Sequence, residues 1–359
     1  MITPIILSGG NGTRLWPMSR KSKPKQFIEF INGETMFTQT IKRFGNRVIF
    51  NEPIILGNIN HEKLIDKEIE KNEINNSKVF LEPKARNTAP AIAAIVAYLH
   101  KHRKGNEIII FLPSDAYINN ITNFTEYLIE AEEIAKNGKV ITFGIKPSYP
   151  ETGYGYIKLD EKISGNSFVV EKFVEKPDLE KAKKFLEDGN YLWNAGIFMA
   201  KASTLYNLFK KYQKELLDNI ELTISNSIEK DNKIYLDKEL FVKSEEISID
   251  YAIIEKLGPD DLAVISMDLI WSDLGSYKSL YDIDSHKNKD KNIINGNVIV
   301  NNSENCYIRA SNKIICCTDI DDLVIIEEQD TILIMKKDKS QNVKKIVDLI
   351  KEQHLEYLL

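Results

Sequence analysis

The fold is decided by the stretch Ile5-Ile6-Leu7-Ser8-Gly9-Gly10-Asn11-Gly12-Thr13-Arg14-Leu15-Trp16-Pro17, which is followed by Pro24-Lys25-Gln26-Phe27. An apolar run typical of a buried strand ends here in a glycine-rich segment, and two cations follow it. Glycines let backbone N–H groups close around an anion because no Cβ is in the way, and Arg14 and Lys25 can add charge. The stretch favours a strand leading into a phosphate-binding loop, with an ordinary glycine-rich turn as the alternative.

Two common glycine loops do not match this stretch. A Walker-type loop requires Gly, four residues and then Gly-Lys-Ser/Thr, and the glycines at 9, 10 and 12 do not provide that spacing. A dinucleotide fingerprint could begin at Gly10, but Leu15 stands at its third glycine position and Trp16-Pro17 is a poor helix start. Kinase-like and dehydrogenase functions are therefore disfavoured.

The composition is that of a globular protein. The chain has 359 residues, 43% of them apolar, enough for one large domain and a smaller one. Its 48 basic and 53 acidic residues are mixed along the sequence, so no nucleic-acid partner is expected. No apolar run approaches the ~20 residues of a membrane span, and no leader-peptide pattern is present. Cys306, Cys316 and Cys317 lack metal-ligand spacing and fit a reducing cytoplasm, with the adjacent pair pointing to opposite faces of a strand.

Strand and helix patterns alternate over the first 145 residues. Apolar runs predict strands at 53–56, 79–81, 108–112 and 140–145, and helical spacing predicts helices at 38–44, 61–71, about 88–105 and 124–136. This alternation predicts a Rossmann-like, doubly wound α/β sheet of mixed strand direction. Because ligands of such sheets lie beyond the carboxyl ends of strands, Asp115 is expected at the same rim as the glycine loop.

The later part of the chain changes character. Extended, partly antiparallel pieces are expected at 150–157 and 168–175, and Asp178 is expected to cap a helix that reaches Gly189. The polar stretch 284–292 is the best linker candidate, which divides the chain into a catalytic domain (1–285) and a C-terminal domain (286–359). Short strands after the linker predict a small β domain, a left-handed β-helix fragment, without clustered catalytic residues. A last apolar helix face at 343–350 can dock on this domain or on a partner chain.

The charged residues of these motifs suit nucleotidyl transfer. A nucleoside triphosphate along the loop would bring a second phosphate against its α-phosphorus, so cations must gather there. Arg14 and Lys25 can hold the triphosphate, and Lys176 can hold the incoming phosphate. Mg²⁺ is commonly bound by one or two carboxylates plus substrate phosphates, a role open to Asp115 and Asp273.

Eight motifs in order resemble the sugar nucleotidyltransferases, and the Ser-Gly-Gly…Leu-Trp-Pro form of the first resembles the mannose-1-phosphate guanylyltransferases of that family. The resemblance runs from the N-terminus to about Tyr281. After the opening motif, the other seven are Glu82-Pro83…Arg86-Asn87-Thr88-Ala89-Pro90, Pro113-Ser114-Asp115, Pro150-Glu151-Thr152-Gly153-Tyr154-Gly155-Tyr156-Ile157, Phe173-Val174-Glu175-Lys176-Pro177, Trp193-Asn194-Ala195-Gly196-Ile197-Phe198, Ser248-Ile249-Asp250-Tyr251-Ala252 and Trp271-Ser272-Asp273-Leu274-Gly275-Ser276.

The resemblance implies transfer of GMP from GTP to mannose 1-phosphate, with Mg²⁺ held by Asp115 and Asp273 and catalysis assisted by Arg14 and Lys25. It implies nucleotide contacts at Leu7, Gly9, Gly10, Gly12, Thr13, Glu82, Pro83, Arg86, Asn87, Thr88 and Ser114. It implies sugar-phosphate contacts at Gly153, Tyr154, Gly155, Glu175, Lys176 and Asn194. A homodimer is also expected, and isomerase activity, carried by an additional segment of longer relatives, is not.

Two positions depart from the family pattern: Ala116 stands where His is common, and Ala195 where Ser is common. The base and sugar therefore stay open, with another hexose or heptose 1-phosphate or another nucleotide as the alternative. A non-catalytic nucleotide-sensing subunit is the second alternative. Each site residue also has an ordinary structural interpretation, such as a turn cap for Asp115 or a core aromatic for Tyr154.

Overall fold

The computed structural model describes residues 1–10, 12–31 and 33–359, so Asn11 of the opening motif lies outside the described residues. The chain forms two compact units. Unit 1 comprises residues 1–9, 40–114 and 118–271, and unit 2 comprises residues 10–39, 115–117 and 272–359. Three of the five boundaries fall within α1 (Met36–Lys42), β7 (Tyr117–Ile118) and β15 (Trp271–Ser272), and each unit is described by itself below.

Unit 1 is built on a mixed sheet in the order β12-β13-β5-β4-β1-β6-β11-β8-β14-β10-β9. Its central strand β1 runs parallel to β4 and β6, whereas β11 is antiparallel to β6 and β8. The expected mixed α/β sheet is thus confirmed. The strands are β1 (Ile2–Ser8), β4 (Ile54–Asn58), β5 (Val79–Glu82), β6 (Ile108–Pro113), β8 (Val140–Ile145), β9 (Tyr156–Ser164), β10 (Ser167–Val174), β11 (Tyr191–Lys201), β12 (Ile228–Lys230), β13 (Lys233–Tyr235) and β14 (Leu262–Met267).

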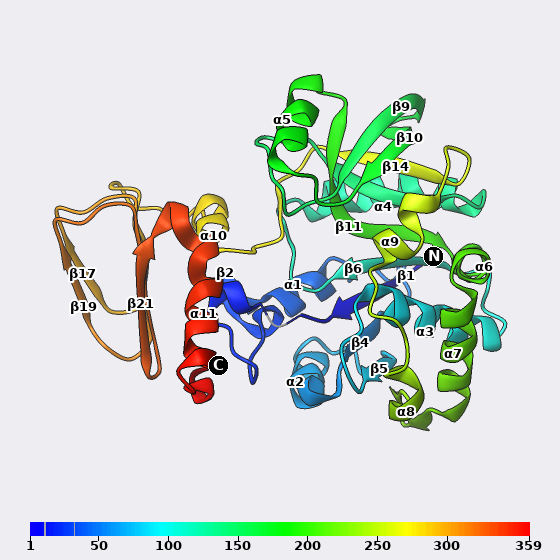
Figure 1. The fold of residues 1–359 in the computed structure, drawn as a ribbon, viewed down its shortest axis with the longest axis horizontal. Coiled ribbons are helices and arrows are strands. Elements are labelled where there is room, and N and C mark those ends of the chain that lie inside the picture. The colour runs from blue at the N-terminus through cyan, green and yellow to red at the C-terminus, as the bar shows by residue number, and fades with distance from the viewer. Residues whose placement is uncertain (11, 32) are drawn as a thin grey trace. The chain divides into compact units, whose positions relative to one another are not determined.

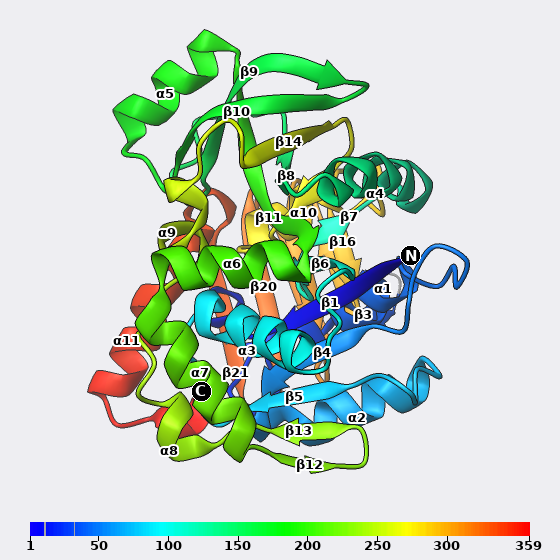
Figure 2. The ribbon, with the colours of Figure 1, turned by 90° about the vertical axis from the view of Figure 1, so that its right-hand side faces the viewer.

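Helices cover this sheet on both faces. Consecutive residues of a strand point to opposite faces, and Ile5 and Ile6, like Ile109 and Ile110, are all 0% exposed. Figure 2 shows α3, α6 and α7 packed side by side over the sheet. The helical elements are η3 (Ile59–His61), α2 (Glu62–Lys71), α3 (Thr88–Lys101), α4 (Ile121–Lys136), α5 (Leu179–Asp188), α6 (Ala202–Tyr212), α7 (Lys214–Asn226), α8 (Lys238–Phe241), α9 (Ile249–Ala252) and η4 (Ile254–Lys256).

Helix caps explain where two predicted boundaries were wrong. Helix α3 ends at Lys101 rather than near Gly105, because Arg103 adopts a left-handed conformation (φ 59°) and Lys104 N donates to Leu99 O. Helix α4 begins three residues early, because the Asn120 side chain accepts from Asn123 N and caps an extra turn. The predicted cap of α5 is confirmed, since Asp178 accepts from Lys181 N.

Unit 2 combines the glycine-loop segment with the C-terminal strands (Figure 1). Strands β16, β18, β20 and β21 form one sheet, and β17 pairs with β19 in parallel, so β16 to β20 alternate between two sheets as in a β-helix. The elements are η1 (Thr13–Leu15), η2 (Lys25–Phe27), β2 (Glu29–Ile31), β3 (Glu34–Thr35), α10 (Tyr277–Ile283), β16 (Ile293–Asn295), β17 (Val298–Asn301), β18 (Tyr307–Ala310), β19 (Ile315–Thr318), β20 (Leu323–Glu328), β21 (Thr331–Lys336), η5 (Lys337–Asn342), α11 (Val343–Glu352) and η6 (Glu356–Leu358).

The core of unit 2 joins the residues after the glycine loop to the last helix. Leu15 and Trp16 share one buried cluster with Val343, Val347 and Ile350 of α11. The last helix therefore packs against its own unit, which is one of the two docking surfaces expected from the sequence.

The predicted linker is folded into unit 2. Asn292 is 1% exposed, donates to Ser303 O and accepts from Cys306 N. Its side-chain amide thus provides hydrogen-bond partners for two backbone groups. The expected alternation of the adjacent cysteines is confirmed, since Cys316 is exposed and Cys317 is buried. Over the described residues, no helix combines the length and apolar character needed to cross a membrane.

Candidate active site

The glycine loop of unit 2 turns tightly against Lys25. Gly12 has a φ of 56°, in the left-handed region, and a Cβ added to it would lie 2.5 Å from Lys25 Cβ. Leu15 N donates to Gly12 O at 2.9 Å, which closes the turn into η1. A glycine is thus required at position 12 both by conformation and by close approach.

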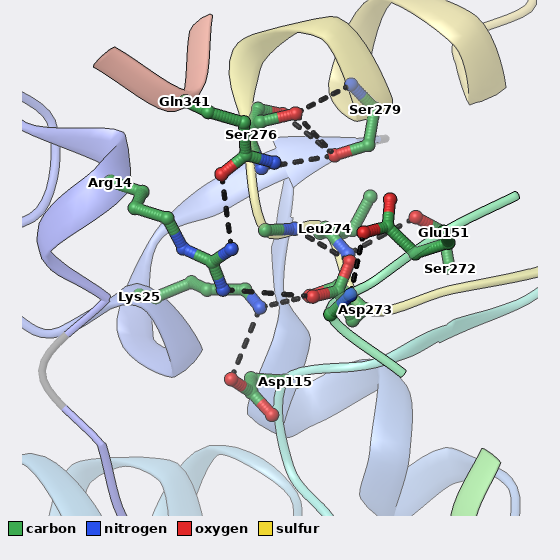
Figure 3. A network of polar contacts seen from close by, with 12 residues as sticks. Arg14, Lys25, Asp115, Glu151, Ser272, Asp273, Leu274, Ser276, Ser279 and Gln341 are labelled. Carbon is green, nitrogen blue, oxygen red and sulfur yellow. Dashed lines mark hydrogen bonds and ion pairs between the residues drawn. The ribbon is translucent and has the colours of Figure 1, made fainter. Parts of the chain in front are cut away.

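Four predicted catalytic residues meet in unit 2, at the place shown in Figure 3. Lys25 is 5% exposed, and its Nζ lies 3.1 Å from Asp115 Oδ2 and also donates to the backbone oxygen of Asp273. Arg14 Nη2 lies 3.8 Å from Asp273 Oδ2. The side chains of Asp115 and Asp273 are 31% and 32% exposed, so these carboxylates face cations and remain accessible to a ligand.

The turn after Asp273 contributes a glycine that the sequence analysis did not single out. A Cβ at Gly275 would lie 2.5 Å from Asp273 Oδ2 and 3.1 Å from Arg14 Nη2. The Gly275 N–H donates to Asp273 Oδ1 at 3.0 Å and so orients the carboxylate. In the sequence, Gly275 could have been identified from its position two residues after Asp273.

The donor set of this cluster fits a hard divalent cation. One ammonium group, that of Lys25, already bridges a carboxylate oxygen of Asp115 and the carbonyl oxygen of Asp273. Oxygen donors of this kind are those that Mg²⁺ prefers, with substrate phosphates completing the shell. The described residues hold no group of three or more His, Cys, Asp or Glu side chains placed to bind a metal by themselves.

Unit 1 places the predicted base-reading residues at the end of β5 and the start of α3. Asn87 caps α3 by accepting from Thr88 N, and the Thr88 hydroxyl accepts from Ile249 N at 2.8 Å. Arg86 donates to Val242 O. Three of these polar residues thus have structural contacts, and Pro83 is half-buried beside them.

Glu82 is the exception in this group. It is 5% exposed, and Oε1 has no hydrogen-bond partner among the described residues. Burial raises the pKa of its carboxyl to about 8. A buried polar atom without a partner costs stability, so Glu82 is a candidate for contact with a ligand.

The predicted sugar-pocket residues of unit 1 form a second cluster. A Cβ at Gly155 would lie 2.5 Å from Glu175 Oε2 and 3.3 Å from Asn194 Cβ, so the glycine allows the three to meet. Lys176 Nζ pairs with Glu175 Oε1. Burial alone would lower the pKa of Lys176, but its bond to Glu175 raises it, which keeps the ammonium charged.

Asp250 belongs to the same cluster although the sequence analysis gave it no role. Asn194 Nδ2 donates to Asp250 Oδ1 at 3.2 Å, while Asn194 Oδ1 accepts from Thr142 Oγ1 and Gly196 N, both at 3.0 Å. Burial and the nearby Glu175 charge raise the pKa of the Asp250 carboxyl to about 6. The signal in the sequence was its place in the motif 248–252.

An aromatic group stands in the same part of unit 1. The ring of Tyr154 contacts Trp193 and Trp271 edge-on, at centroid distances of 5.4 and 5.2 Å. Gly153 N donates to Glu151 Oε1 at 2.8 Å and shapes the turn that carries Tyr154.

The remaining predicted residues lie at strand ends or in the loop. Ser114 N donates to Leu7 O at 3.0 Å, so the ends of β1 and β6 are adjacent as expected. Gly9, Gly10 and Thr13 are exposed. Ala116 and Ala195, which depart from the family pattern, are each 2% exposed.

The predicted site residues fall into both compact units. The loop from Gly10 to Arg14, Lys25, Asp115 and Asp273 belong to unit 2. The residues at the strand ends, at the predicted base position and in the sugar cluster belong to unit 1.

Comparisons with known proteins cover nearly the whole chain. Residues 3–290 match the family model "Nucleotidyl transferase", and residues 296–350 match "MannoseP isomerase/GMP-like beta-helix domain". A mannose-1-phosphate guanylyltransferase of Klebsiella pneumoniae is 37% identical over 99% of this chain and 76% of its own length, and one of Escherichia coli is 36% identical with the same coverage.

Among solved structures, one described as a mannose-1-phosphate geranyltransferase from Thermus thermophilus superposes with a TM-score of 0.84 at 26% identity. It covers 98% of this chain and 99% of its own. The chain therefore belongs to the nucleotidyl transferase family, in the group that contains these mannose-1-phosphate guanylyltransferases.

Proposed function

We propose that this protein transfers GMP from GTP to α-D-mannose 1-phosphate, which gives GDP-mannose and pyrophosphate. The family and the names of the relatives support the reaction class and both substrates. The observation that carries the proposal is the cluster of Arg14, Lys25, Asp115 and Asp273 beside the glycine loop. Two cations and two accessible carboxylates at one point suit phosphoryl chemistry at a polyanion.

The glycine loop is the proposed triphosphate site. Backbone N–H groups at Gly9, Gly10, Gly12 and Thr13 would meet phosphate oxygens, and Arg14 and Lys25 would neutralise their charge. The Asp115 side chain is 31% exposed, so a ligand can reach it and compete with Asp115 for the Lys25 ammonium.

Asp115 and Asp273 are the proposed Mg²⁺ ligands, the latter through its carboxylate or its carbonyl oxygen. When bound, the cation would neutralise charge on the α-phosphoryl group and on the departing pyrophosphate. Lys25, which contacts both aspartates in this structure, would then be released toward the phosphates.

Glu82 is the proposed reader of the guanine base, with Pro83, Arg86, Asn87, Thr88, Leu7 and Ser114 as further nucleotide contacts. Guanine presents an N1–H and an amino group that a carboxylate can accept. Glu82 Oε1 has no hydrogen-bond partner in the described part of the chain, which supports this role because the guanine donors would satisfy it.

The sugar phosphate is assigned to the second cluster of unit 1. Asn194 and Glu175 would bond to sugar hydroxyls, Gly153, Tyr154 and Gly155 would line the pocket, and Lys176 would hold the phosphate. The support is that Gly155, Glu175, Lys176 and Asn194 are brought together in the folded chain.

The chemistry follows from these positions. An oxygen of the sugar phosphate attacks the α-phosphorus, a new P–O bond forms, and the bond to the bridging oxygen of the β-phosphate breaks as pyrophosphate leaves in line. No side chain acts as nucleophile, because the sugar phosphate is already anionic. The residues of the chain bind, orient and neutralise the two polyanions.

Pyrophosphate release from GTP and mannose 1-phosphate, with and without Mg²⁺, tests the proposal. Turnover that depends on Mg²⁺ is expected. A panel of ATP, UTP and dTTP with other hexose and heptose 1-phosphates tests the alternative substrates, and absence of guanosine turnover would remove the main assignment. Binding of GTP without turnover in any combination would favour a nucleotide-sensing subunit.

Three further assignments are part of this proposal. The chain would divide into a catalytic domain at 1–285 and a β-helix-like domain at 286–359, and the two matched family models, over residues 3–290 and 296–350, support a boundary close to this position. The enzyme acts as a homodimer. It works in the cytoplasm, where its three free cysteines would stay reduced.

A further inference from the structure

Arg14 is held from two directions within unit 2. Its Nη2 faces the Asp273 carboxylate at 3.8 Å, and its Nη1 donates to Gln341 Oε1 at 3.1 Å (Figure 3). Gln341 lies near the end of η5, 327 positions away along the chain, in the C-terminal part that the sequence analysis expected to hold no catalytic cluster.

The element that carries Gln341 is anchored to the segment that carries Arg14. Helix α11 begins two residues after Gln341, and its Val343 and Val347 are buried with Leu15 and Trp16, which directly follow Arg14. The Trp16 indole Nε1 also donates to Leu358 O at 2.8 Å.

A second contact ties η5 to the turn that carries Asp273. Lys278 N, on α10, donates to Ser340 Oγ at 3.4 Å. Helix α10 starts just after Gly275, beside which Arg14 Nη2 lies. The Gln341 amide is therefore presented from a packed framework and not from a free tail.

Glutamine is chemically suited to orienting an arginine without neutralising it. An amide oxygen accepts one of the five guanidinium N–H donors and carries no charge, so the cation and its remaining donors stay available for phosphate oxygens. The Arg14 side chain is 45% exposed, and a long exposed side chain without such a bond would sample many rotamers. Holding it before the ligand arrives lowers the entropy lost on binding.

We propose that Gln341 is a positioning residue for the nucleotide-binding step: its amide oxygen fixes the Arg14 guanidinium beside Asp273 so that the cation is ready for the GTP phosphates. The inference rests on the proposed function, in which Arg14 contacts the triphosphate. It assigns the C-terminal segment a direct part in the phosphate site.

The test is a double-mutant cycle of Gln341→Leu and Arg14→Ala, with steady-state kinetics for both substrates. Loss of one exposed hydrogen bond from a guanidinium to an uncharged amide oxygen changes an equilibrium by about 5- to 10-fold, so Gln341→Leu is expected to lower kcat/KM for GTP by that factor. The KM for mannose 1-phosphate at saturating GTP and the melting temperature are expected to stay near the wild-type values. In the Arg14→Ala background, Gln341→Leu is expected to add no further loss.

Asn342→Leu is the matched control, because it removes an exposed amide from the adjacent position of η5. Wild-type GTP kinetics in this control together with the loss in Gln341→Leu would support the proposal. Equal losses in both variants, or the same loss from Gln341→Leu with and without Arg14, would overturn it.

The cycle also separates this inference from the proposed function. If Arg14→Ala weakens GTP use but Gln341→Leu does not, the positioning role is wrong and the phosphate role of Arg14 stands. If Arg14→Ala itself leaves GTP kinetics unchanged, the phosphate role fails and the positioning role fails with it.

Discussion

In unit 2 the carboxylates of Asp115 and Asp273 face the cations Lys25 and Arg14. In unit 1 the carboxyl of Glu82 is buried, that of Asp250 is half-buried, and the pKa values of both are raised. In the first arrangement the carboxylates balance the charges of Lys25 and Arg14, and a bound polyanion can take the place of the carboxylates. In the second arrangement the raised pKa values keep the two carboxyls partly protonated until a ligand provides hydrogen-bond donors. The two regions are therefore expected to respond differently to loss of a carboxylate: the first through turnover, the second through substrate recognition and pH dependence.

The largest effect is expected from Asp273→Asn in unit 2. The substitution removes the charge that faces Arg14 and would bind the metal, so turnover should fall by about 10²- to 10³-fold, the usual cost of losing one electrostatic contact to a transition state. The melting temperature should change little, because the side chain is 32% exposed. Pyrophosphate release and thermal unfolding measure the two quantities.

Asp282→Asn is the matched control for this variant, since Asp282 pairs with Lys278 on the same unit's surface. It should turn over at the wild-type rate. Near-wild-type turnover in Asp273→Asn would exclude this aspartate from the metal pair and weaken the contrast between the regions.

A smaller effect is expected from Asp250→Leu in unit 1. The change removes the acceptor for Asn194 Nδ2, so the Asn194 amide is held less firmly in its orientation. The KM for mannose 1-phosphate should therefore rise about 5- to 10-fold. The KM for GTP should stay unchanged.

Asp250→Asn retains an acceptor at the same place and should give a milder rise. If both variants behave alike, the charge of Asp250 and not its hydrogen bond supports the sugar pocket. A rise in the KM for GTP alone would contradict the assignment of this cluster to the sugar.

The smallest effect on activity is expected from Glu82→Gln, whose main consequence concerns stability. The pKa of this carboxyl is about 8 in the folded chain against an ordinary value of 4.5, so the folded state holds a proton that the unfolded chain releases. Stability should fall as pH rises from about 4.5 toward 8, with the full cost present above pH 8. The variant should therefore melt higher than the wild type at pH 9 and match it near pH 4.

Thermal unfolding across this pH range checks the expectation, with the exposed Glu245→Gln as control. GTP should also raise the melting temperature of Glu82→Gln less than that of the wild type, since the base would lose an acceptor. An unchanged pH slope in the variant would show that Glu82 is not the source of the effect.

The elements and motifs could be identified from the sequence because they depend on local patterns. The strands around 53–56, 79–81 and 140–145 were found from apolar runs, and Asp178 was found as a cap from its place before a helical pattern. The predicted end of helix α3 lay too far along the chain, because Arg103 adopts the left-handed backbone conformation that ends the helix although it is not a glycine.

The missed residues share a different property. Asp250, Gly275 and Gln341 act through contacts with residues distant in the chain, or through the space that they leave open. The stretch 284–292 looked like a linker because it is polar, yet the Asn292 amide satisfies buried backbone groups. Polarity alone does not separate a solvated connection from a buried hydrogen-bonding one.

By itself, the sequence determined the alternating α/β architecture, the glycine loop and the resemblance to the family, since periodicity and motif order are properties of the chain alone. Only the tertiary structure decided that Lys25 bridges Asp115 and Asp273, and that the C-terminal segment reaches Arg14. It also decided that Glu82 is buried with no hydrogen-bond partner for its Oε1 among the residues that the structure describes. The physical reason is that charge pairing and desolvation depend on distance and burial in space. A linear order of residues does not specify either quantity.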